Sequence, residues 1–167
     1  MITAVYADGG CVGHNPSTIA GTWAACLVDE HEDRAREVSG VIRPRDIGSK
    51  FVTNNHAEFY GLLRGLEELP DGWSGTACSD SKVTLGRFFL GWKLTAIPPE
   101  WSRRMGFALR RLGKITPLLV NGHPTKLQLL ENSGHSGRPV SSFNVWCDLE
   151  CKRQGQMFLA RRRLVAS

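Results

Sequence analysis

Four acidic residues lie where a strand or a helix is expected to begin or end. They are Asp8, Glu58, Asp80 and Asp148. Strand ends and helix starts can meet at one edge of an open sheet, so the four carboxylates could converge there. Converging carboxylates repel one another unless a cation neutralises them. Mg²⁺, with Mn²⁺ as a substitute, suits such a site because it prefers carboxylate oxygens and keeps waters for a substrate phosphate. Two such ions about 4 Å apart can promote phosphodiester hydrolysis without a protein nucleophile.

Each acid also has an ordinary structural interpretation. Asp8 precedes Gly9, and Asp-Gly is a common turn dipeptide. Asp80 could cap the helix that is expected to follow it. Glu58 stands three residues after Asn55, which is the spacing of a capping box, and the acid in the last helix could simply be solvated. For one acid taken alone the ordinary interpretation is favoured, so the metal hypothesis depends on all four together.

Hydrophobic periodicity indicates the elements that must position these acids. Strands are expected over residues 2–7, 20–28, 35–42, 75–79 and 125–130, and helices over 54–69, 83–89, 100–112 and 143–159. The first three strands form an antiparallel meander, and strands alternate with helices afterwards. The order predicts an α/β protein with a five-stranded mixed sheet flanked by helices. Residues 114–124 have the character of an insertion with no assigned role.

The composition favours one globular domain. The chain has 167 residues, of which 41% are hydrophobic and 22% charged. We expect a single domain over 1–160 and a basic tail over 161–167, which contains three consecutive arginines. No apolar run approaches the roughly 20 residues of a membrane helix, and the N-terminus is a poor signal peptide, so a cytoplasmic protein without membrane contact is expected. A monomer is expected by default. The net charge of +5 suits a polyanionic partner.

The five cysteines do not predict a disulfide framework or a zinc ribbon. Their number is odd and no CxxC pair is present. Cys147 and Cys151 are four residues apart on an expected helix and could share a metal, although a structural zinc site normally has four ligands. A zinc protein therefore stays open as a minor alternative.

The residues around the acids resemble the motifs of the type 1 ribonuclease H family (bacterial RNase HI). The matching words, in chain order, are YADGGC (6–11), TNNHAE (53–58), CSDS (78–81), GHSG (134–137) and CDL (147–149). The resemblance extends over roughly residues 2–155, and the order of elements agrees with it. Each word is short, but five in the right order on the expected elements are specific. The resemblance implies a ribonuclease H-like fold in which three antiparallel strands are followed by parallel ones.

The resemblance also implies roles for individual residues. Asp8, Glu58, Asp80 and Asp148 would be catalytic metal ligands, and His135 would assist proton transfer or product release. The positions that would contact the substrate are Cys11, Asn15, Asn54, Asn55, Ser81 and Lys82. His14 separates Gly13 from Asn15, and Lys82 stands where the family often has Gln; a lysine there could touch a phosphate as a point charge.

A basic stretch in the middle of the chain resembles the protrusion with which many family members grip the DNA strand. Its candidate residues are Lys93, Arg103, Arg104, Arg110, Arg111 and Lys114, with Trp92 and Trp101 as stacking or packing partners. A solvated helix face with core tryptophans explains the same residues. The arginines at 161–163 could hold a phosphate or belong to a frayed tail.

The activity that the resemblance implies is cleavage of the RNA strand of RNA–DNA hybrids, largely independent of sequence, leaving 5′-phosphate and 3′-hydroxyl ends. A hybrid-binding module without catalysis is one alternative. A nuclease of the same fold that acts on branched DNA is another.

Overall fold

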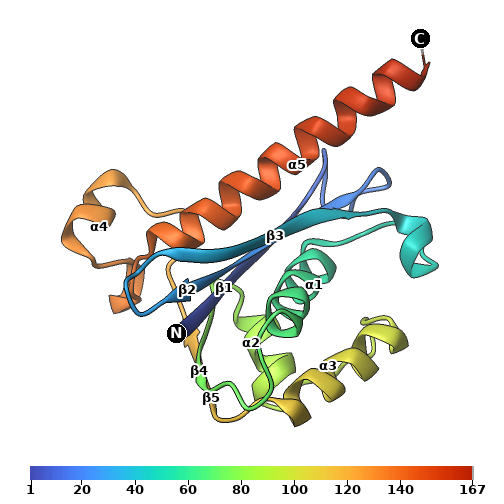
Figure 1. Cartoon of the computed structure of the whole chain (residues 1–167). Helices are drawn as coiled ribbons and strands as arrows, with labels where there is room; N and C mark the ends of the chain where they lie inside the picture. Colours follow the sequence, from blue (N-terminus) through green and yellow to red (C-terminus); the bar gives the residue numbers. More distant parts are fainter. Residues whose placement is uncertain (167) are drawn as a thin grey trace.

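The computed structural model of the chain describes residues 1–166 and contains one five-stranded sheet between two helical layers (Figure 1). The strands are β1 (Ile2–Cys11), β2 (Gly21–Asp29), β3 (Arg34–Ile42), β4 (Gly75–Ser79) and β5 (Ile115–Leu119). The α-helices are α1 (Asn54–Glu67), α2 (Lys82–Phe89), α3 (Pro99–Arg111), α4 (Lys126–Glu131) and α5 (Ser142–Ala166). Two short 3₁₀ helices, η1 (Pro44–Ile47) and η2 (His135–Gly137), lie in loops.

The strands follow the order β3-β2-β1-β4-β5 across the sheet. β1 pairs antiparallel with β2, and β2 with β3, whereas β4 lies parallel to β1 and to β5. The predicted five-stranded mixed sheet is therefore confirmed. Helices α1, α2 and α3 cover one face, and α5 crosses the other (Figure 1).

The chemical character of β1 changes from one sheet face to the other. Val5 and Ala7 belong to the large hydrophobic cluster beneath α1, together with Phe59 and Leu62 of that helix. Tyr6, on the opposite face, packs against a smaller cluster that contains Cys147 of α5. This alternation has the period of two residues that a strand buried on both faces requires.

Two glycines allow α1 to lie directly on β1. A Cβ atom on Gly9 would stand 2.2 Å from the backbone nitrogen of Glu58, and one on Gly61 would stand 2.7 Å from the carbonyl oxygen of Asp8. Real side chains cannot approach backbone atoms so closely. The missing side chains therefore let the start of α1 bring Glu58 to the end of β1.

The fifth strand was predicted in the wrong place. It is β5 at Ile115–Leu119, inside the stretch interpreted as an insertion, whereas residues 125–130 largely form α4. Pro117 interrupts the strand pattern of β5 in the sequence. A proline is tolerated at this position because β5 is an edge strand. Thr125 and Gln128 form a capping box that starts α4, so the leucines that follow belong to a helix.

Helix α5 continues beyond its predicted end at residue 159 and reaches Ala166, so its last turns project past the sheet (Figure 1). No glycine or proline interrupts residues 156–166, and alanine, leucine and arginine favour a helix there. The expected basic tail is thus helical as far as residue 166, and residue 167 lies outside the described residues. The domain boundary at 160 stays a prediction. Within residues 1–166, no helix is both long enough and apolar enough to cross a membrane.

Candidate active site

Three of the four predicted acids come together at one edge of the sheet. Asp8 lies near the end of β1, Glu58 in the second turn of α1, and Asp80 directly after β4. Each offers a carboxylate oxygen, and these oxygens all lie within 4.8 Å of one another. Asp148 of α5 lines the same pocket, which has a volume of about 300 Å³. The four acids thus meet where the carboxyl ends of β1 and β4 adjoin.

The ordinary interpretations of three acids are wrong. Helix α1 is capped by Thr53, whose side chain accepts a hydrogen bond from the backbone N–H of His56, so Glu58 is not part of its capping box. Helix α2 is capped by Ser81 and not by Asp80. Asp8 is not a turn residue, because β1 continues to Cys11. These side chains are therefore not needed as caps or turn residues.

Burial makes the ionised forms of the three clustered acids costly. It is the main cause that raises the pKa of Asp8 well above its usual value, and the charges of Asp80 and Glu58 raise it further. Burial raises the pKa of Glu58 to about 7 and also raises the pKa of Asp80. Oε2 of Glu58 is buried without a hydrogen-bond partner. None of the three carboxylates forms a salt bridge with a Lys or Arg of residues 1–166. The group therefore fits a hard divalent cation, since such an ion would neutralise the charges and use the free oxygen.

The fourth acid lies at the edge of this cluster and has cationic partners. Oδ2 of Asp148 is 2.6 Å from Nζ of Lys152 and 3.5 Å from Nδ1 of His123. Asp148 is therefore not a freely solvated helix acid. Because Asp148 lies at the edge of the pocket, the group of carboxylate oxygens within 4.8 Å of one another contains Asp8, Glu58 and Asp80 but not Asp148.

The structure places a different histidine from the predicted one in the pocket. His123 lines it, whereas His135 is exposed, with its Nδ1 2.8 Å from Oγ of Ser136. The backbone N–H of His135 donates to Oδ1 of Asn121, which keeps this part of the loop beside the end of β5. His135 was predicted because its GHSG word resembles a family motif, whereas the Gly-His pair at 122–123, which follows β5, matches no motif. The role proposed for His135 stays a prediction, and His123 becomes a second candidate.

Asn144 is a further residue that sequence reasoning missed. Its side chain is buried, and Nδ2 lies 3.5 Å from Oδ2 of Asp80. Asn144 precedes Asp148 by four residues, so both project from the same side of α5. The backbone at Gly122 also lies close to Asp80, since a Cβ atom on Gly122 would stand 2.5 Å from Oδ2 of that acid. The sequence did contain one signal for Asn144, because it is a polar residue one helical turn before Asp148.

Half of the predicted substrate-contacting residues line the pocket. Oδ1 of Asn15 accepts hydrogen bonds from the backbone N–H of Asn54, at 3.0 Å, and from Sγ of Cys11, at 3.7 Å. These three residues form a polar wall beside the acids. The other three, Asn55, Ser81 and Lys82, are not among the lining residues: Asn55 and Lys82 are exposed, and Ser81 caps α2.

The middle basic segment is partly structural. Arg104 forms an ion pair with Glu67 at 2.7 Å, and Arg111 donates hydrogen bonds to backbone carbonyls at the end of α1. Trp101 is a core residue, whereas Trp92 is 39% exposed. Arg103 pairs with Glu100. The basic residues of this segment that stay exposed without an ion pair inside residues 1–166 are Lys93, Arg110 and Lys114.

Four of the five cysteines, Cys26, Cys78, Cys147 and Cys151, are buried core residues. Burial raises the pKa of both Cys147 and Cys151, so these side chains stay protonated thiols. Sγ of Cys147 lies 3.9 Å from Sγ of Cys26 without forming a disulfide. Within the described part of the chain, the acidic triad is the one group of three or more potential ligand side chains, which removes the support for a zinc site.

Comparisons with known proteins agree with this fold. No family model matches the chain. It is 32% identical to the ribonuclease H of Syntrophus aciditrophicus over 99 residues, which are 59% of this chain and 50% of that protein. It is 28% identical to the ribonuclease H of Oleidesulfovibrio alaskensis over 153 residues, 86% of this chain and 84% of the relative. The match to the first of these relatives thus spans half of its length.

The fold is shared with solved ribonucleases H. LC11-RNase H1, isolated from compost, superposes with a TM-score of 0.66 at 18% identity, covering 95% of this chain and 99% of that one. This chain has the ribonuclease H-like fold. Its ribonuclease H fold places the pocket at the end of the two central parallel strands. A structure of LC11-RNase H1 in complex with an RNA/DNA hybrid also matches, with a TM-score of 0.52 at 21% identity over 69% of this chain and 83% of that one.

Proposed function

We propose that the chain is a metal-dependent endonuclease that hydrolyses the RNA strand of RNA–DNA hybrids. The observation that carries the proposal is the triad of the buried Asp8 and the half-buried Glu58 and Asp80, whose oxygens lie within 4.8 Å of one another. The curated relatives named ribonuclease H support the reaction. The LC11-RNase H1 complex supports the substrate, because that protein of the same fold was solved with an RNA/DNA hybrid.

The four acids of the pocket would bind the metal ions that the reaction needs. Asp8, Glu58, Asp80 and Asp148 would hold Mg²⁺, with Mn²⁺ as a substitute. When bound, these ions supply Lewis acidity for in-line attack by water on the phosphodiester. A bond forms from the water oxygen to phosphorus, the P–O3′ bond breaks, and the 3′ oxygen takes up a proton. The products carry a 5′-phosphate and a 3′-hydroxyl.

The polar wall beside the acids would bind the substrate. Short side chains such as Cys11, Asn15 and Asn54 can reach a shallow minor groove, in which 2′-hydroxyl groups mark the RNA strand. The contact would be extended along the sugar-phosphate backbone of the substrate by Asn55, Ser81 and Lys82. Contacts to sugar and phosphate carry no base identity, so little sequence specificity is expected.

A histidine at the rim of the acidic pocket would donate or accept a proton during the reaction. His123 is in place for this role because it adjoins Asp148 and lines the pocket. His135 could take it only after the loop rearranges, since its ring is bonded to Ser136 on the exposed side. A histidine can donate or accept a proton near neutral pH.

Two alternatives are weaker. A hybrid-binding module without catalysis would not need three mutually repelling acids so close together. A nuclease for branched DNA would use the same acids but would not need a polar wall suited to 2′-hydroxyl groups. A cytoplasmic location and a monomeric state stay predictions.

A panel of labelled substrates tests the proposal. With Mg²⁺, the protein should cut the RNA strand of a hybrid and leave duplex RNA and branched DNA intact. Chelation of the metal should stop the reaction, and Mn²⁺ should restore it. Hybrid binding without cleavage in either metal would favour the binding module, and preferential cutting of branched DNA would contradict the assigned substrate.

A further inference from the structure

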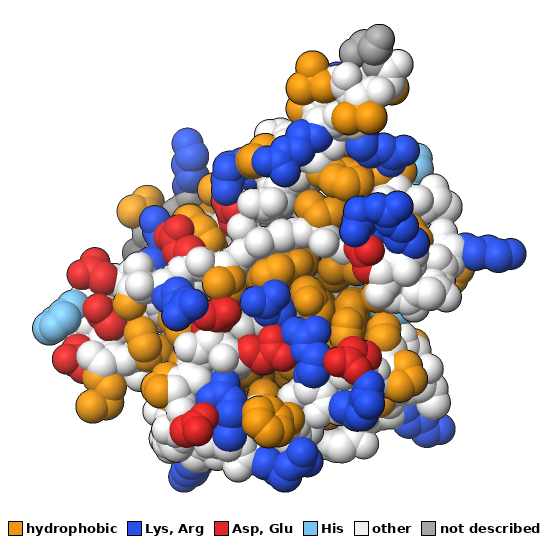
Figure 2. Space-filling model, turned by 45° about the vertical axis from the view of Figure 1, so that its right-hand side comes forward, with side chains coloured by type: hydrophobic (Ala, Val, Ile, Leu, Met, Phe, Trp, Pro, Cys, Tyr) orange, Lys and Arg blue, Asp and Glu red, His pale blue; other side chains and the backbone are white. Residues whose placement is uncertain are grey.

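A groove runs beneath the projecting half of α5, outside the acidic pocket. We call it the arginine groove. It consists of two adjoining hollows of about 460 and 470 Å³ that share Arg43 and Phe158. The first lies between α5 and the end of β3, and the second between α5, η1 and the loop that joins β1 to β2. Figure 2 shows Lys and Arg side chains bordering hydrophobic side chains below the projecting helix end.

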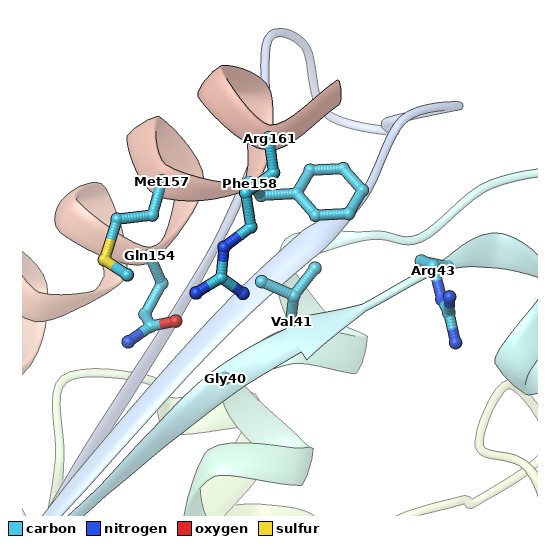
Figure 3. A pocket seen from close by; sticks show the side chains of 7 residues that line it. All are labelled: Gly40, Val41, Arg43, Gln154, Met157, Phe158 and Arg161. Atoms are coloured by element: carbon cyan, nitrogen blue, oxygen red, sulfur yellow. The ribbon is translucent and has the colours of Figure 1, made fainter. Parts of the chain in front are cut away.

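The groove has a hydrophobic floor and basic rims. Figure 3 shows Arg161 and Gln154 pointing from α5 toward Gly40 and Val41 of β3, with the ring of Phe158 beside them. The guanidinium of Arg162 lies 5.8 Å from the centre of the Phe158 ring. The aromatic ring therefore limits where this charge can lie.

The rim charges are available to an outside anion. Arg161 and Arg162 on α5 and Arg45 on η1 are exposed, and none forms a salt bridge with a carboxylate of residues 1–166. Arg43 is different, because Asp46 holds its guanidinium at 2.9 Å, and its side chain turns away from α5 in Figure 3. Three guanidinium groups without a salt bridge inside residues 1–166 therefore line one groove, which suits an extended polyanion.

The groove adjoins the acidic pocket through a single loop. Residues 13–15 of the β1–β2 loop line the acidic pocket, and Thr18 and Ile19 of the same loop line the groove. Asp148 and Arg162 lie on the same side of one helix, fourteen residues and so about 21 Å apart along its axis. With one phosphate per roughly 3.4 Å of strand, this distance corresponds to about six nucleotides. A duplex held at the acids could therefore reach the groove.

We propose that the arginine groove binds the phosphodiester backbone of the substrate duplex about six nucleotides from the cut site. This inference rests on the proposed function and extends it, because it assigns the enzyme a second contact that acts on affinity and not on chemistry. An acidic protein segment would also be attracted to arginines, but the shared loop and the spacing from the acids favour the substrate itself.

Charge-neutralising substitutions on a substrate with a fixed cut site test the groove. A short RNA stretch within a DNA duplex fixes the site, and the flanks are either about 4 or about 12 base pairs long, so that only the long flanks reach the groove. The test variant is R161Q/R162Q. The matched control is R34Q/R36Q, which removes the same charge at the opposite end of β3.

The expected result is a KM effect confined to the long substrate. For R161Q/R162Q, KM on long flanks should rise roughly 5-fold or more with kcat unchanged, and the slope of log affinity against log salt should fall by about 2. On short flanks this variant should equal wild type, and R34Q/R36Q should equal wild type on both substrates. Equal KM values for R161Q/R162Q and wild type on long flanks would overturn the proposal.

A binding measurement separates this inference from the proposed function. Fluorescence anisotropy with the long duplex in the absence of metal reports on the groove even if the wild-type protein cuts nothing. Weaker binding by R161Q/R162Q alone supports the groove whatever the outcome for catalysis. Unchanged duplex affinity, together with weaker binding of a polyglutamate peptide, would assign the groove to an acidic protein and overturn the proposal.

Discussion

Replacing Asp8 by Asn is expected to abolish cleavage of RNA–DNA hybrids and, without metal, to make the protein more stable. Asp8 is the most buried member of the triad, so the substitution removes a central charge from the cation site. A metal cluster supplies several kcal/mol of transition-state stabilisation, and each 1.36 kcal/mol changes a rate tenfold. The cleavage rate in Mg²⁺ should therefore fall by about 10³-fold or more.

The stability effect of the same substitution depends on pH. Burial and neighbouring acids raise the pKa of Asp8 in the folded protein. Above about pH 4 the Asp8 carboxyl is ionised in the unfolded chain but stays protonated in the folded protein. The metal-free native protein therefore loses stability as the pH rises toward the pKa of Asp8 in the folded state. Asn stays neutral and can still accept the hydrogen bond that Asp8 accepts from the N–H of Gly9. Metal-free D8N should thus unfold at a higher temperature than wild type at pH 8 and at nearly the same temperature at pH 4.

Asp33→Asn is a suitable control for both effects, because Asp33 is an exposed acid in the turn between β2 and β3. This variant should keep wild-type activity and the wild-type dependence of unfolding temperature on pH. Hybrid cleavage by D8N at the wild-type rate would show that the triad does not hold the catalytic metal.

Replacing His123 by Ala is expected to lower the cleavage rate by roughly 10²-fold, the usual contribution of a positioned general acid or base. His135→Ala should change the rate less than about threefold, because the ring of His135 lies outside the pocket. Single-turnover cleavage at saturating Mg²⁺ compares the two variants under conditions in which metal binding is not limiting. A large loss with His135→Ala and none with His123→Ala would mean that the loop moves on binding the substrate.

The sequence was sufficient to predict four of the five strands and the convergence of three acids, because both depend on local signals. Asp8 and Asp80 end apolar strands, and Glu58 occurs in a motif at the start of a long helix. The sequence could not show which neighbouring residues provide the helix caps. Thr53 and Ser81 take that role, and this leaves the acids free to face one another.

The predictions that failed depended on competition between local patterns. In β5 the strand pattern is interrupted by Pro117, and only the position of β5 at the sheet edge makes that proline acceptable. The leucines of α4 suggested a strand until the Thr125 capping box was seen. His135 was preferred to His123 for a separate reason, because the GHSG word around it resembles a family motif. The projecting end of α5 was missed because helix-favouring residues and a frayed tail cannot be distinguished without their three-dimensional context.

The most direct measurement is the anomalous diffraction of manganese in crystals of the wild-type protein. Mn²⁺ scatters anomalously and is expected to occupy the same oxygen ligands as Mg²⁺. A peak within coordination distance of the carboxylates of Asp8, Glu58 and Asp80 is predicted, and this peak should be absent in D8N crystals soaked in the same way. If a saturating soak left the wild-type triad without a peak while these oxygens faced one another, the proposed metal-dependent mechanism would be contradicted.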